Sequence, residues 1–274
     1  MSLWMRWEER NPMLAETRIV LRRWLGLKGD NLQAKLVIAA VCVVVLGIIG
    51  AVARYSFLVD TTVAFPIAWV LLGLVSIITL HGALAREREK RSMEVLLTTP
   101  LTAKQIVLGK LTRAVPAITA ILVCVPIFLL ASGLGRAFFK ENGLTWGDNL
   151  PAAVVMLALL GYLVSSSFFA MCLTMAVSAI TQRVAASLLL SFALWVVVYL
   201  IVPIILSSIF WGDAGISMWH PMAAFFALVG FSEYSSLSSF IVIGWQLALG
   251  AGLLVFAIRR MSRETQAAGA AVSG

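Results

Sequence analysis

The sequence predicts an all-α integral membrane protein with six transmembrane helices, and its composition and its long charge-free stretches predict this fold. Hydrophobic residues make up 61% of the 274 residues, and charged residues only 12%. Globular proteins average roughly 45–50% apolar and ~25% charged residues. A soluble domain of this composition would expose large apolar patches, and disorder requires low hydrophobicity and high charge. The solvent for most of these side chains is therefore lipid.

Six charge-free stretches are the expected spans, because a helix crosses a bilayer with about 20 mostly apolar residues. They lie at residues 36–53, 61–85, 114–135, within 149–182, 184–207 and 237–258. A seventh uncharged stretch, 214–232, contains His220 and Pro221, which are both unfavourable in a simple lipid-facing span. We therefore treat the seventh stretch as a connection between spans five and six.

The distribution of Lys and Arg supports six spans with both termini in the cytoplasm. In that arrangement all but three of the 21 basic residues lie on the inner side, and the exceptions are Arg54, Arg136 and Lys140. Cytoplasmic loops carry such an excess of Lys and Arg. A seventh span would place the basic cluster after residue 258 outside. The net charge of +8 is thus a topology signal, and we expect no nucleic acid partner.

The segment before the first span predicts an amphipathic helix over residues 13–28 that lies in the headgroup layer. Its apolar face includes Trp24, and Arg18, Arg22 and Arg23 point largely away from that face, toward anionic lipid. We expect one membrane domain over residues 1–274. It comprises this cytoplasmic and interfacial part (1–35), a six-helix part (36–258) and a cytoplasmic tail (259–274).

The connection at 208–233 is external, apolar and aromatic in this topology. It is either an interfacial loop anchored by its aromatic residues or a pair of short helices that dip back into the membrane. The residues that we assign to the dipping segment are Trp211, Trp219, His220, Pro221 and Phe225.

Residues for catalysis are missing where an intramembrane enzyme would need them. No Asp, Glu, Lys or Arg lies well inside a span, and His81 and His220 fall on opposite sides of the bilayer. The chain has no P-loop, because Leu111 follows Gly109-Lys110. We expect no catalytic, metal or cofactor site, and we interpret the adjacent serines 165–167 as helix-packing groups.

The segment between spans two and three carries most of the functional signal. Charges alternate in sign over residues 86–91, which suits a solvated or docking surface. Ser92 is a plausible N-cap for a short helix that Pro100 ends. Thr102 and Gln105 match a capping box for the following helix. The residues alone leave two interpretations open, a docking helix for a partner and an interfacial connector.

This segment resembles the signature of permease subunits of ABC transporters of the ABC-2 exporter type. In that signature a charged run precedes a Thr/Ser-(Leu/Met)-Glu-x-Leu-Leu-x-(Thr/Ser)-Pro-Leu stretch, and a Gly-Lys follows. The matching residues here are Glu87, Arg88, Glu89, Ser92, Met93, Glu94, Leu96, Leu97, Thr99, Pro100, Leu101, Leu108, Gly109 and Lys110. The departures are Ser92 and Met93, where Thr and Leu are commoner.

The resemblance covers nearly the whole chain, and it implies which proteins bind to the chain and where the complex lies. It implies a homodimer or heterodimer of permeases in the inner membrane of a prokaryote. Two separate ATP-binding subunits would hold ATP and Mg. Residues Glu87, Arg88, Glu89, Ser92, Glu94, Leu96, Leu97 and Pro100 would form a coupling helix that docks into the ATPase.

Two other functions remain open. A membrane scaffold could recruit cytoplasmic proteins through residues 86–113 without transport. The second alternative is a passive channel, although no ring of polar pore residues is visible in the sequence. The sequence does not select a cargo.

Overall fold

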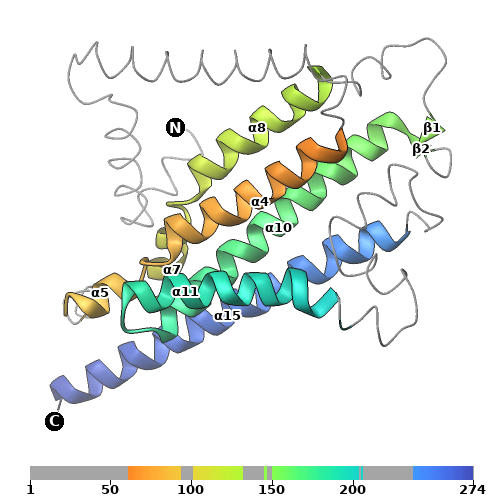
Figure 1. Ribbon diagram of the computed structural model, residues 1–274. Helices are drawn as coiled ribbons and strands as arrows, with labels where there is room; N and C mark the ends of the chain where they lie inside the picture. Colours follow the sequence, from red (N-terminus) through yellow and green to blue (C-terminus); the bar gives the residue numbers. More distant parts are fainter. Residues whose placement is uncertain are drawn as a thin grey trace, which may run out of the picture.

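The computed structural model describes residues 61–93, 101–131, 145–146, 150–203, 205 and 237–273, and these form a bundle of long apolar helices (Figure 1). The predicted first span (36–53), the predicted amphipathic helix (13–28) and the connection at 208–233 lie outside the described residues. Five described helices are long and apolar enough to cross a membrane. They are Ala68–Glu89, Ala103–Val123, Leu157–Ile180, Val184–Ile201 and Phe240–Ala267. These correspond to predicted spans two to six, so the prediction of a multi-pass membrane protein is confirmed.

The described elements follow one another along the chain in this order. Helix α4 (Thr61–Leu80) leads through a turn into α5 (Ala85–Glu89), and α7 (Ala103–Leu111) precedes α8 (Val115–Ala131). Helix α10 (Ala152–Ile180) is followed by α11 (Val184–Val196), which continues as the π-helix η1 (Val197–Ile201). The last helix is α15 (Leu237–Ser273).

Three details differ from the sequence-based prediction. Two short antiparallel strands, β1 (Thr145–Trp146) and β2 (Leu150–Pro151), pair just before α10, where only helices were expected. The fifth span ends in a π-helical turn at η1. The tail predicted at 259–274 continues the sixth span as one helix to Ser273, because no Pro or Gly interrupts the sequence where its charges begin.

Local sequence explains where α7 begins. Thr102 is its N-cap, and the Thr102 side chain accepts from the backbone N–H of Gln105. The Gln105 side chain accepts in return from the backbone N–H of Thr102 at 2.9 Å. This reciprocal pair satisfies two amides that a helix start leaves without intrahelical partners. The predicted capping box is therefore confirmed.

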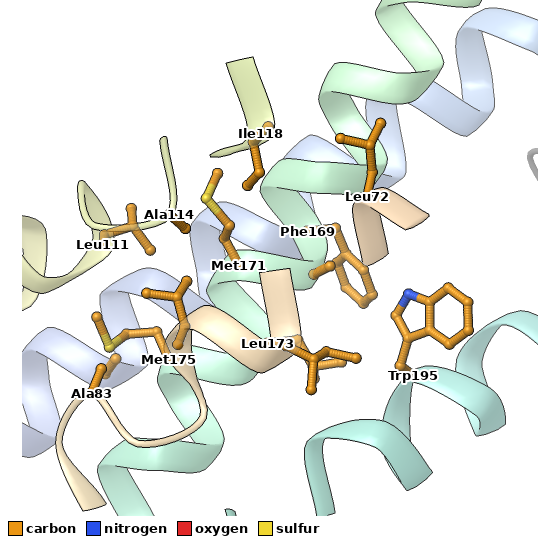
Figure 2. Packing of buried hydrophobic residues seen from close by; sticks show 14 of the residues in the cluster. Leu72, Ala83, Leu111, Ala114, Ile118, Phe169, Met171, Leu173, Met175 and Trp195 are labelled. Atoms are coloured by element: carbon orange, nitrogen blue, oxygen red, sulfur yellow. The ribbon is translucent and has the colours of Figure 1, made fainter. Parts of the chain in front are cut away.

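Helix α10 is the centre of the bundle. Its apolar stretch is 83% buried inside the protein, whereas those of α11 and α15 are each 22% buried. Figure 2 shows side chains of α10, among them Phe169, Met171 and Met175, packed between residues of the surrounding helices. Large apolar side chains face outward on α11, η1 and α15, and they include Leu189, Phe192, Leu200, Phe240, Leu249 and Phe256. An apolar outer face of this kind is what lipid contact requires.

Candidate functional site: the polar clasp

The charged residues predicted between spans two and three lie at one end of the bundle, where α5, α7, the α10–α11 connection and the last turns of α15 come together (Figure 1). We call the interacting set the polar clasp. Its members are Glu87, Arg88, Glu89, Ser92, Lys110, Ser178, Thr181, Val184 and Glu264.

The first turn of α5 is capped by a side chain from another helix. Leu84, the N-cap residue of α5, has no side chain that can accept a hydrogen bond. The Ser178 hydroxyl of α10 accepts instead from the backbone N–H groups of Leu84 and Ala85, at 2.9 and 3.1 Å. A buried helix start needs such acceptors, and here the need ties α5 to α10.

Arg88 connects α5 to two further parts of the bundle. One terminal nitrogen, Nη1, donates to the backbone carbonyls of Ser178 and Thr181, at 2.9 and 3.2 Å. These carbonyls belong to the end of α10, where a cation is favourable. The other nitrogen, Nη2, donates to both carboxylate oxygens of Glu264 on α15, at 2.9 and 2.8 Å. The Arg88 side chain is only 14% exposed.

Glu87 holds the segment that follows α5 in place against α7. Its carboxylate accepts from Lys110 Nζ at 3.1 Å and from the Ser92 hydroxyl. The Lys110 side chain is 7% exposed, so this ion pair is largely shielded from solvent. The Glu87 carbonyl also accepts from the backbone N–H of Ser92 at 2.9 Å. Arg91 has a φ of 56°, the left-handed conformation in which the chain reverses before Ser92.

Glu89 completes the clasp at the start of α11. Its carboxylate accepts from the backbone N–H of Val184 at 2.9 Å. Arg183, the N-cap residue of α11, makes no side-chain cap hydrogen bond. A carboxylate at a helix N-terminus compensates the unpaired N–H groups and the positive end of the helix dipole.

The clasp brings together four of the predicted docking residues, Glu87, Arg88, Glu89 and Ser92, and it shows that they bind other parts of this chain. The alternating charges favoured a solvated or docking surface, whereas carbonyls and a carboxylate of this chain surround the Arg88 guanidinium. The backbone of Met93, directly after Ser92, is helical.

The remaining predicted site residues lie outside the described residues. They are Glu94, Leu96, Leu97 and Pro100 of the coupling helix, Arg18, Arg22, Arg23 and Trp24 of the interfacial helix, and Trp211, Trp219, His220, Pro221 and Phe225 of the external segment.

Sequence reasoning did not assign three of the side chains in the clasp to a site. Lys110 entered only through the motif, and Ser178 and Glu264 were not singled out. One feature of the sequence could have identified Glu264, because it is the only acidic residue after Glu233 and lies among basic residues. It also pairs with Arg260 one helical turn away, at 3.4 Å.

The ion pairs and hydrogen bonds of the clasp join five helical elements, α5, α7, α10, α11 and α15. Within the described ranges, His, Cys, Asp and Glu side chains form no group of three or more that could hold a metal ion.

Comparison with known protein families matches residues 26–264 to a family described as ABC-2 family transporter protein. No curated protein was found to match the chain. The matched range includes the whole clasp and every described span except the last three residues of Phe240–Ala267.

Proposed function

The chain belongs to the ABC-2 family of transporter proteins, and we propose that it is the membrane permease subunit of an ATP-driven exporter. Two permease copies, or one copy and a related chain, form the translocation pathway. Two separate ATP-binding subunits bind ATP and Mg and perform the hydrolysis. The whole of residues 1–274 acts as one transmembrane domain.

The clasp is the observation that supports this proposal most strongly. It binds Glu87 and Ser92, which lie just before residues 94–100, where the coupling helix of the permease would begin. It also joins that point to the end of α7, to the start of α11 and to α15. A docking helix can drive a transporter only if its movement reaches the spans, and these contacts supply such a route.

Coupling requires that the ATPase contacts differ between nucleotide states, because equal contacts would shift no equilibrium. In this mechanism the closing ATPases displace the coupling helix, and Glu94 and Leu97 make polar and apolar contacts with them. Arg88 carries the displacement to α15 through Glu264, and Glu89 carries it to α11. The spans then move relative to the second permease and open the pathway.

Docking is tested by the double substitution Glu94→Ala with Leu97→Ala, measured in the complex purified with its ATPase. Lys104→Ala is the matched control, because Lys104 is exposed on the neighbouring α7. We expect the double variant to lose most of the stimulated ATP hydrolysis and export, and the control to retain both. Unchanged hydrolysis and export in a well-expressed double variant would refute the docking assignment.

Transmission is tested by Glu87→Gln, which removes the charge that Lys110 faces across 3.1 Å. We expect this variant to bind the ATPase normally while export per ATP hydrolysed falls severalfold. If the protein is instead a scaffold that only recruits partners, both the unaltered chain and the variant should bind normally, and neither should export. Normal export per ATP in the variant would exclude the clasp as the transmission route.

We further propose that the protein lies in a prokaryotic inner membrane with both termini in the cytoplasm. Single cysteines introduced at residues 213–220 should then react with an impermeant maleimide added outside intact cells. Cysteines at residues 259–264 should react only after the membrane is opened. The reverse pattern contradicts the six-span topology.

A further inference from the structure

The last helix, α15, carries two arginines on the side that faces away from the bundle. Arg259 and Arg263 are one helical turn apart, directly after the apolar part of the span, and both are exposed. Ala257 and Met261, on the opposite side of the same turns, are fully buried. The two arginines therefore point from α15 toward the surroundings of the bundle, at the end where the clasp lies.

These two charges have no counter-charge in the part of the chain that the structure describes. No ion pair there joins Arg259 or Arg263 to a carboxylate. The nearby carboxylate of Glu264 is 3.4 Å from Arg260, and both its oxygens accept from Arg88. Like charges one helical turn apart repel each other, so an anion between Arg259 and Arg263 would stabilise both. Guanidinium groups bind phosphate through two parallel hydrogen bonds.

The same side of α15 is apolar and open along the span that precedes the arginines. Ala248, Gly252 and Val255 are exposed, and they lie with the two arginines within about 80° of one another around the helix axis. A Cβ added at Gly252 would meet no atom within 4 Å. From Ala248 to Arg259 the helix rises about 16 Å, which matches half of a hydrocarbon core of ~30 Å. One acyl chain can therefore follow this side from the headgroup layer to the middle of the membrane.

The charges select among the molecules that could cover this side. A symmetric contact with a second copy of the chain would bring the Arg259 and Arg263 side chains of both copies together, and like charges repel strongly where little water screens them. An anionic lipid instead supplies a phosphate and an apolar chain in the order that the helix presents. The general excess of basic residues on one side of a membrane does not require that they share a helix face with an open apolar surface.

From these observations we propose that Arg259 and Arg263 bind the phosphate of an anionic phospholipid, such as phosphatidylglycerol, whose acyl chain lies along Val255, Gly252 and Ala248. A zwitterionic lipid binds more weakly, because its ammonium group offsets the charge of its phosphate. Arg260 is not part of the site, because Glu264 compensates its charge. This binding requires that the chain lie in a membrane, and it does not rest on the transport function.

The test is native mass spectrometry of the full-length protein, equilibrated in detergent with phosphatidylglycerol and phosphatidylcholine that carry the same acyl chains. Each arginine near an anionic headgroup contributes roughly a fivefold gain in affinity. The first bound lipid should therefore be phosphatidylglycerol with a preference of roughly thirtyfold. The double substitution Arg259→Gln with Arg263→Gln should reduce this preference to less than about threefold.

The matched control is Arg260→Gln with Lys104→Gln, which removes the same total charge from exposed residues of α15 and α7. This control should keep the preference for phosphatidylglycerol. An equal loss in both double variants would show that the attraction is diffuse and would overturn the site. Equal binding of the two lipids by the unaltered protein would overturn it as well, whether or not the variants fold.

Two further results of the same experiment separate a lipid from the other candidates. Glycerophosphoglycerol, which is the headgroup without acyl chains, should not displace the bound lipid, and displacement at equal concentration would overturn the assignment to a lipid. The spectra also report dimers of the chain. If the Arg259 and Arg263 double variant changes the dimer fraction and leaves the lipid preference intact, this side of α15 binds a second copy, and the proposal is wrong.

Discussion

The ion pair between Arg88 and Glu264 is expected to stabilise the bundle by an amount that a double-mutant cycle can isolate. The two side chains are 14% and 24% exposed, and Arg88 Nη2 contacts both carboxylate oxygens at 2.9 and 2.8 Å. Exposed pairs contribute ~0.2–1 kcal/mol, and breaking a fully buried pair costs ~3–5 kcal/mol. This pair lies between those limits, so we expect a coupling energy of about 2 kcal/mol.

The cycle uses Arg88→Met, Glu264→Met and the double variant, because Met is uncharged, matches the length of Glu and retains the aliphatic part of Arg. Each single change leaves a charge without its partner, and the double change removes both charges. Loss of the Glu264 contact with Arg260 occurs in both arms and cancels. The measurement is the free energy of unfolding of the full chain in mixed micelles with an increasing fraction of SDS, followed by circular dichroism.

The control cycle replaces Arg260 and Glu264. Arg260 is 49% exposed and lies 3.4 Å from the carboxylate one turn away, so its coupling should be only ~0.3–0.5 kcal/mol. A coupling for Arg88 and Glu264 below about 0.5 kcal/mol, or no larger than that of the control, would refute the claim that the clasp holds α5 on α15.

Three further predictions concern packing and capping. Gly73→Ala should lower the unfolding free energy by ~1–3 kcal/mol, because the added Cβ would lie 2.7 Å from the Trp195 ring. Gly252→Ala adds a Cβ with nothing within 4 Å, so this variant should instead raise the unfolding free energy by ~0.5–1 kcal/mol through helix propensity. Equal effects at the two glycines, measured by thermal unfolding in detergent, would contradict the close approach of α4 and α11. Thr102→Ala should lower the unfolding free energy by ~1 kcal/mol by removing the cap of α7, and Thr102→Asp should lose much less. If the Asp variant is as unstable as the Ala variant in the same assay, capping is not the cause.

Features that depend on neighbouring residues were predictable from the sequence. The span at residues 61–85 is helical over Thr61–Leu80, and the span within 149–182 is helical over Ala152–Ile180. The Thr102 capping box could be read from residues three positions apart. Each of these rests on hydrophobic length or helix capping, which act within a few turns of one helix.

Features that depend on which helices meet were not predictable from one sequence. The carboxylate of Glu87 and the ammonium of Lys110 are 23 residues apart in the chain, and Arg88 and Glu264 are 176 apart. The alternating charges of residues 86–91 carry no signal that separates exposed Arg86 from mostly buried Arg88. The pairing of Gln246 on α15 with Ser165 and Ser166 on α10 was missed because an uncharged polar residue interrupts no hydrophobic stretch.

By itself the sequence determined that the chain lies in a membrane, where its helices run and which segment resembles a coupling motif, because hydrophobic content and motif spacing are properties of the chain. Only the tertiary structure decided that Glu87, Arg88 and Glu89 bind this protein's own helices, and that Gln246 of α15 pairs with Ser165 and Ser166 of α10. Those outcomes depend on how α10 packs against α4, α11 and α15. Hydrogen-bond partners that are distant in the chain become neighbours only when that packing forms.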